Sequence, residues 1–231
     1  MNKNVIYTAI FGGYDNLPEP SVIPEGWDFI CFTDGDIKSD IWNIRKVTSL
    51  YEDSTRTARK YKILPHRFLK KYENSIWVDG NFLIKGDVNI LWKNHMDLNL
   101  TVYSHMATFD KRNCIYEEAK MINHLFNINQ SPNKKPKDNL SIIENQMQRY
   151  KKQNYPEDNG LIMSGVLLRK HNSKDVIKTM ESWWSELKYG SRRDQLSFNY
   201  VCWKEGMSFM EIYDDIRDNK FFKLLKHNKH I

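Results

Sequence analysis

Short apolar runs alternate with amphipathic stretches along this chain. The clearest runs are rich in β-branched and aromatic residues, and a Gly or an Asp directly follows each of them, at 4–11, 28–33 and 75–78. A run of this length and composition predicts a strand buried on both faces, as in a parallel sheet. Further strands are expected at 100–104, 161–168 and, from a weaker pattern, 208–212.

Helical spacing of apolar residues fills the stretches between these runs. Ser54 is expected to cap a helix that ends at Leu64, where Pro65 stops it and opens a second helix reaching Tyr72. Ser191 is expected to open a helix with Asp194 three residues in, as in a capping box. Other helices are predicted at 114–126, at 140–152 and after Ser173.

Strands that alternate with helices indicate βαβ units. The expected fold class is therefore α/β, with a mainly parallel, Rossmann-like sheet flanked by helices in one domain of residues 1–231. The polar, Pro-containing segment 127–138 is expected to be a loop. The tail 221–231 pairs apolar anchors with Lys and His, which suits a last helix docked on the body or an end that touches a membrane.

The composition indicates the cellular compartment of the protein more clearly than its function. Three cysteines without metal-ligand spacing predict no disulfide framework, which favours a reducing, cytoplasmic compartment. No apolar stretch approaches the roughly 18 residues of a membrane span, so membrane association is expected to be peripheral at most. A formal net charge of +6 suits an anionic ligand, an anionic membrane surface or nucleic acid, and does not choose among them.

Polar residues follow the first two predicted strands, where ligands of parallel sheets bind. Gly12 and Gly13 let a ligand approach the backbone, and Tyr14 can stack on a base or ribose; a plain tight turn is the alternative. Asp34, at the end of the second strand, can accept a hydrogen bond from a ribose or base, or simply shape a turn.

The end of the third strand carries the sharpest signal. Asp79 and Asn81 place two oxygen donors two residues apart just as the strand stops. Hard cations such as Mn²⁺ and Mg²⁺ prefer these donors and keep positions open for substrate phosphates. The sequence therefore predicts a divalent-cation site here, with an Asp-Gly turn as the alternative.

Two basic segments are candidates for binding the substrate. Arg56, Arg59 and Lys60 recur at helical spacing, and such a face can neutralise a diphosphate or merely be solvated. Asp194 can act as a general base or bind an acceptor hydroxyl, although its spacing alone favours a helix cap.

Six stretches, in this order, resemble a known family. They are YTAIFGGYD (7–15), DFICFTD (28–34), RTARKYKILPHRFL (56–69), SIWVDGN (75–81), RNCIYEEA (112–119) and GSRRDQLSFNYV (190–201). The family is the glycosyltransferase-like one long filed as domain of unknown function 616, which includes plant proteins linked to cell-wall polysaccharides. It resembles in turn the GT-A glycosyltransferases, in which a D-x-D motif holds Mn²⁺ or Mg²⁺.

The resemblance assigns roles to individual positions. Asp79 and Asn81 stand at the D-x-D positions, with an amide in place of the second acid. Thr8, Phe11 and Tyr14 lie where such enzymes hold the base and ribose, and the basic helix lies where a helix faces the diphosphate. Asp194 and Gln195 match a pair found near the reacting sugar. Many such enzymes add a late histidine ligand to the metal, for which His227 is the candidate, followed by His230.

The function expected from these residues is sugar transfer from a nucleoside-diphosphate sugar to a hydroxyl of a glycan or lipid-linked acceptor, assisted by a divalent cation. A nucleotide- or glycan-binding protein without catalysis is the alternative, because Asn81 replaces an acid. Basic charge interleaved with aromatic residues raises a third option, a nucleic-acid binder. No helix-turn-helix, zinc-finger or ribonucleoprotein motif supports it, so no nucleic-acid partner is expected.

Overall fold

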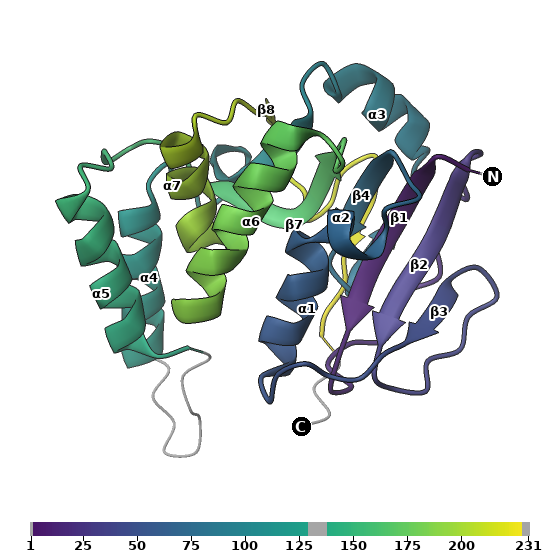
Figure 1. Cartoon of the computed structure of the whole chain (residues 1–231), viewed down its shortest axis with the longest axis horizontal. Helices are drawn as coiled ribbons and strands as arrows, with labels where there is room; N and C mark the ends of the chain where they lie inside the picture. The colour runs from purple at the N-terminus through teal and green to yellow at the C-terminus, as the bar shows by residue number, and fades with distance from the viewer. Residues whose placement is uncertain (1, 129–137, 228–231) are drawn as a thin grey trace.

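A seven-stranded sheet organises the computed structural model, which describes residues 2–128 and 138–227. The strand order is β3-β2-β1-β4-β7-β6-β8 (Figure 1). The strands are β1 (Asn4–Ile10), β2 (Trp27–Thr33), β3 (Asn43–Lys46), β4 (Asn74–Val78), β6 (Leu100–Ser104), β7 (Ile162–Arg169) and β8 (Met210–Ile212). All neighbouring pairs are parallel except those of β7, which runs antiparallel to β4 and β6. The predicted mainly parallel α/β sheet is confirmed.

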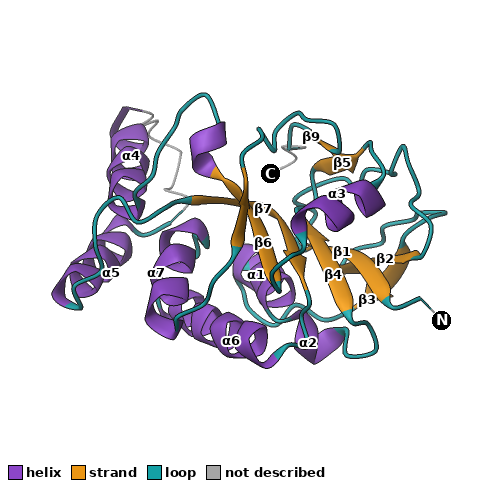
Figure 2. Ribbon diagram, turned by 90° about the horizontal axis from the view of Figure 1, so that it is seen from above, coloured by secondary structure: helices purple, strands orange, loops and turns teal. Residues whose placement is uncertain are grey.

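Both faces of the sheet are covered, which explains why its central strands read as continuous apolar runs. In β1, Val5 and Tyr7 pack into one hydrophobic cluster, whereas Ile6 and Ile10 pack into the other. Figure 2 shows α1 and α6 on one side of the sheet, and α3 with the strands β5 and β9 on the opposite side. The chain therefore has two apolar layers separated by one sheet.

The helices are α1 (Ser54–Ile63), α2 (Pro65–Phe68), α3 (Val88–His95), α4 (Ile115–Ile128), α5 (Leu140–Lys152), α6 (Lys174–Tyr189) and α7 (Gln195–Glu205). Two predicted starts were wrong. The carboxylate of Asp53, not Ser54, caps α1 by accepting hydrogen bonds from the N–H groups of Thr55 and Arg56. Asp194 caps α7 at its own position, so this helix begins three residues later than a cap at Ser191 would place it.

The last described residues form a strand and not the helix that was one expectation for the tail. β9 (Phe222–Leu224) pairs antiparallel with β5 (Phe82–Ile84). The described part of the tail, 221–227, is thus docked on the body, and His230 lies outside the described residues. Most of the loop predicted at 127–138 also lies outside them, and α4 takes its first two residues. Within the described part of the chain, no helix is long and apolar enough to cross a membrane.

The register of the sheet brings two of the motifs together. β1 and β4 are parallel neighbours, with Tyr7 opposite Trp77, so their carboxyl ends lie at the same edge. A Cβ on Gly80 would lie 2.7 Å from the side chain of Ile10, a distance that side chains do not tolerate. Glycine at position 80 therefore lets the loop after β4 pass directly against the end of β1.

Candidate functional site

A cavity of about 420 Å³ opens at the carboxyl ends of β1 and β4. Its wall combines the loop after β1, the first turns of α1, the loop after β4, the start of β7, the turn before α7 and the docked tail. The polar residues that line it are Tyr14, Asp15, Ser54, Thr55, Arg59, Asp79, Asn81, Ser164, Arg192, Arg193, Asp194, Gln195 and His227. The cavity occupies the position where ligands bind in open α/β sheets.

Two carboxylates and two cations form an ion-pair cluster at the floor of this cavity. Lys62 Nζ lies 2.5 Å from Asp194 Oδ2 and 3.2 Å from Asp79 Oδ1. Arg59 pairs with the same two carboxylates, at 3.1 Å from Asp194 and 3.3 Å from Asp79. Asp79 Oδ1 also accepts a hydrogen bond of 2.8 Å from the indole of Trp77. The cluster is balanced in charge, and its lysine side chain is completely buried.

The cluster fixes the protonation of Asp194. Burial opposes its ionisation, but the charges of Arg59 and Lys62 outweigh that cost and lower the pKa of Asp194 to about 2. Burial lowers the pKa of Lys62, and the two carboxylates offset part of that effect. Asp194 is therefore an ionised and fully paired carboxylate, which makes it a weak proton acceptor at neutral pH.

The tail closes one side of the cavity through contacts with both strand-end loops. Asn81 donates its side-chain N–H to the Leu225 carbonyl (2.9 Å), and the Leu225 N–H donates to the Asn81 carbonyl (2.8 Å). His227 Nδ1 lies 2.6 Å from Asp15 Oδ1, and its ring packs edge-on against Tyr14. Burial raises the pKa of Asp15, the charge of Asp79 adds to this, and His227 opposes it.

Three of the cation donors predicted from the sequence line this cavity, although they do not form a complete site by themselves. Asp79, Asn81 and His227 face the same space, but Asp79 Oδ1 and the Asn81 N–H already have partners. In residues 2–128 and 138–227, no three His, Cys, Asp or Glu side chains stand together closely enough to hold a metal ion.

The structure divides the predicted site residues into two groups. Those that line the cavity are Phe11, Tyr14, Arg59, Asp79, Asn81, Asp194, Gln195 and His227. Those that do not are Thr8, Gly12, Asp34, Arg56 and Lys60.

Local contacts account for each residue of the second group. Thr8 is fully buried within β1. Gly12, at a φ of +64°, donates its N–H to Asp34 Oδ1 at 3.0 Å, so this pair shapes the turn. Arg56 bonds to backbone carbonyls at the end of α6, and Lys60 lies over the Tyr51 ring. Of the three basic residues predicted to face a diphosphate, only Arg59 lines the cavity.

Lys62 and Asp15 were missed as site residues. Lys62 follows Arg59 by three positions and so shares its helix face, which was the available signal. Its burial, however, depends on carboxylates 17 and 132 positions away, which the basic run itself does not indicate. Asp15 directly follows Tyr14 in the turn after the first strand. Its partner His227 comes from the opposite end of the sequence.

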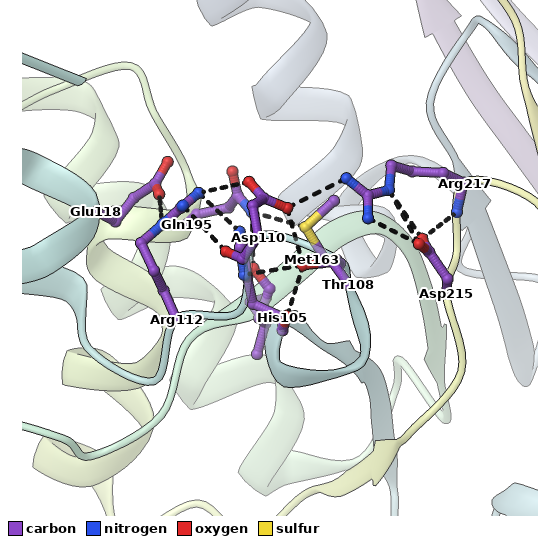
Figure 3. A network of polar contacts seen from close by, with 10 residues as sticks. His105, Thr108, Asp110, Arg112, Glu118, Met163, Gln195, Asp215 and Arg217 are labelled. Atoms are coloured by element: carbon purple, nitrogen blue, oxygen red, sulfur yellow. Dashed lines mark hydrogen bonds and ion pairs between the residues drawn. The ribbon is translucent and has the colours of Figure 1, made fainter. Parts of the chain in front are cut away.

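A second polar network adjoins the wall that contains Gln195. The Gln195 side chain donates to the Ile162 carbonyl at 2.7 Å and lies near the sulfur of Met163 (Figure 3). Beside it, Figure 3 shows contacts that run from Glu118 through Arg112, Asp110 and Arg217 to Asp215. Every carboxylate in this run has a guanidinium partner, so the network fastens the loop after β6 next to the cavity.

Comparisons with known proteins agree with the family predicted from the sequence motifs. The family described as "TOD1/MUCI70, glycosyltransferase-like domain" matches residues 32–227. Similar solved structures include the apo form of mouse xyloside xylosyltransferase 1, with 9% identity, a TM-score of 0.47, and coverage of 91% of this chain and 84% of that one. Another is the apo WbbM bifunctional glycosyltransferase, with 9% identity and a TM-score of 0.46, where 87% of this chain matches 37% of that one. No curated protein sequence matches the chain.

Proposed function

Because the chain belongs to the TOD1/MUCI70 glycosyltransferase-like domain family, we propose that it transfers a sugar from a nucleoside-diphosphate donor to a hydroxyl of a glycan or lipid-linked acceptor, assisted by a divalent cation. The observation that carries this proposal is the cavity at the ends of β1 and β4, where aromatic rings, carboxylates and guanidinium groups converge. Such a combination suits a ligand that has a flat base, an anionic centre and a hydroxyl-rich end.

The donor is proposed to lie across the loop after β1 and the start of α1. Phe11 and Tyr14 offer ring faces for the base and ribose. Ser54 and Thr55 bring the positive end of a helix dipole to the cavity, and Arg59 adds a guanidinium. These groups would stabilise the negative charge that develops on the leaving diphosphate.

A Mn²⁺ or Mg²⁺ ion is proposed to sit beside Asp79, with the Asn81 side-chain oxygen and His227 as further donors. The chemistry of this donor set fits, because such ions take one or two carboxylates from the protein and complete their shell with substrate phosphates and water. An incomplete protein site is therefore expected before the donor binds. When bound, the ion would supply positive charge next to the diphosphate.

Asp194 is proposed to act as a positioning residue. A carboxylate with a pKa of about 2 is too weak a base to take a proton from an acceptor hydroxyl near neutral pH. Its two ion pairs instead hold Arg59 and Lys62 against Asp79. Gln195, whose side-chain N–H is bonded to the Ile162 carbonyl, is proposed to present its oxygen to the substrate.

One observation favours the alternative of a binding protein without catalysis. The amide of Asn81 holds the tail, which is a structural use for a residue at a predicted cation position. Thermal unfolding with UDP, GDP, CDP and ADP, each with and without Mn²⁺, tests both readings. A ligand at about 100 times its Kd adds roughly 2.7 kcal/mol to stability.

If the protein is a transferase, we expect one nucleotide to raise its unfolding temperature. This increase should require Mn²⁺ and should be absent in Asp79→Ala. Release of that nucleoside diphosphate is also expected when the matching donor sugars are supplied. Nucleotide binding without turnover on a panel of donors and acceptors would favour the binding protein. A folded protein that responds to no nucleotide would contradict the proposed function.

A further inference from the structure

The charged groups that line the cavity can be paired one by one. Its carboxylates are Asp15, Asp79 and Asp194, its guanidinium groups are those of Arg59, Arg192 and Arg193, and the imidazole of His227 also lines it. Arg59 pairs with Asp79 and Asp194, and His227 pairs with Asp15. Arg192 pairs at 2.9 Å with Asp53, the residue that caps α1. Within residues 2–128 and 138–227, Arg193 is the cavity-lining cation without a carboxylate within 4.0 Å.

Arg193 is also incompletely hydrogen-bonded. Its Nε atom is buried from solvent and has no hydrogen-bond partner in the described part of the chain. A buried guanidinium N–H without a partner costs stability, because it has lost water and gained nothing in exchange. A ligand in the cavity that accepts a hydrogen bond from this N–H would account for its lack of a partner within the protein.

The position of Arg193 indicates which part of the ligand it meets. The ion pair between Arg192 and Asp53 holds the turn before α7 against the beginning of α1. The Arg193 N–H donates to Ser191 Oγ at 3.1 Å, which fixes the backbone of that turn. Arg193 and the first turn of α1, with Ser54 and Thr55, thus belong to the same cavity, on adjoining segments. Both features attract anions.

We propose that Arg193 binds the diphosphate of the donor through its guanidinium group. This inference rests on the proposed function and adds a residue that neither the basic helix nor the Asp79 region had supplied. A planar guanidinium makes paired hydrogen bonds to phosphate oxygens, and these charge-assisted bonds are among the stronger ones in proteins. The other charged side chains that line the cavity already have partners among the described residues, so Arg193 adds to Arg59 and the start of α1 a guanidinium that is not yet neutralised.

Titration calorimetry with inorganic pyrophosphate tests the inference without knowledge of the base. Arg193→Gln should weaken pyrophosphate binding by about 10-fold or more, the range of a lost charge-assisted hydrogen bond. Arg193→Lys keeps the positive charge but loses the paired N–H groups of the guanidinium. Its affinity for pyrophosphate should therefore lie between those of the wild type and Arg193→Gln. Arg67→Gln is the control, since it removes the same charge from a partly exposed pair with Glu181 outside the cavity, and it should weaken binding by less than about 3-fold.

A second set of measurements uses the nucleoside diphosphate that stabilises the wild type most, and its nucleoside. Arg193→Gln should weaken the diphosphate and leave the nucleoside unchanged. Equal loss for the diphosphate and the nucleoside, a loss in Arg67→Gln equal to that in Arg193→Gln, or unchanged pyrophosphate binding in a folded Arg193→Gln protein would overturn the role of Arg193. If Arg193→Gln weakened the binding of glucuronate, a sugar acid, and left pyrophosphate binding unchanged, that would also overturn the proposal. Arg193 would then bind an acidic sugar and not the diphosphate. Wild-type protein that binds neither pyrophosphate nor any nucleotide would instead remove the proposed function itself.

Discussion

Replacing Lys62 with Met tests whether the buried ion-pair cluster stabilises the fold as well as the site. Methionine has a similar length and no charge, so it fills the same space beside the Trp77 ring, over which Lys62 Nζ now lies. The change removes the 2.5 Å contact to Asp194 and the 3.2 Å contact to Asp79. Asp194, whose side chain is 4% exposed, then keeps only Arg59 as an ionic partner.

The expected loss of unfolding free energy in Lys62→Met follows from the burial of the ion pair and from the pKa of Asp194. Removing one partner of a buried pair costs about 3–5 kcal/mol, and the retained Arg59 places this case near 3 kcal/mol. The fall in the pKa of Asp194 from 3.8 to about 2 corresponds on its own to roughly 2 kcal/mol at neutral pH. Because the folded-state pKa is the lower one, this contribution is present above pH 3.8 and is lost as the pH falls through 2.

Urea unfolding of the wild type, Lys62→Met, Asp194→Asn and the double variant measures these quantities. Each single change should cost about 3 kcal/mol at pH 7, and the double variant should lose less than their sum by about 1–3 kcal/mol. At pH 3 the difference between wild type and Asp194→Asn should shrink by about 1 kcal/mol. Single variants within about 0.5 kcal/mol of wild type, or strictly additive losses, would refute the reasoning.

Two further changes test how the loops after β1 and β4 are held. Gly80→Ala should lower the free energy of unfolding in urea by about 1–3 kcal/mol, because the new Cβ would meet the Ile10 side chain at 2.7 Å. Gly35→Ala, where the nearest atom to the new Cβ is at 3.6 Å, is the control. Equal stability of the two variants would contradict the close approach of Gly80 to Ile10. Asn81→Leu should speed hydrogen exchange of the Leu225 N–H, since the amide that holds the tail is lost. Asn113→Leu, which removes an amide bonded to the Asp158 carbonyl, should leave that exchange unchanged.

The sheet was the part of the fold that its sequence pattern predicted best. The runs at 4–11, 28–33 and 75–78 are strands because both faces of each strand are covered, which leaves little room for polar positions. The direction of β7 could not be predicted in this way, since a buried run looks the same in either orientation. The short strands β3, β5 and β9 were missed because three or four residues carry too little periodicity.

The candidate site was predicted where it follows single strand ends and missed where it depends on distant partners. Asp79 and Tyr14 follow buried strands, so their place at the cavity could be inferred from parallel topology. Arg56 and Arg59 lie in the same basic run of the sequence, yet only Arg59 pairs with Asp79 after β4 and with Asp194 at the start of α7. Among the described residues Arg193 has no carboxylate partner because the nearby carboxylates pair with other cations, and no local sequence pattern records those pairings.

The contact between Asp15 and His227 has a consequence for how the molecule is made. These two residues are separated by 212 positions, and Leu83 of β5 pairs with Lys223 of β9, 140 positions later. During synthesis on the ribosome, β1, β2 and β4 can pair long before residue 227 has left the exit tunnel, since chains emerge at roughly 5–20 residues per second. The wall that the tail contributes is therefore assembled last, and a nascent chain passes through a stage in which its sheet exists and its cavity is still open to the surrounding water.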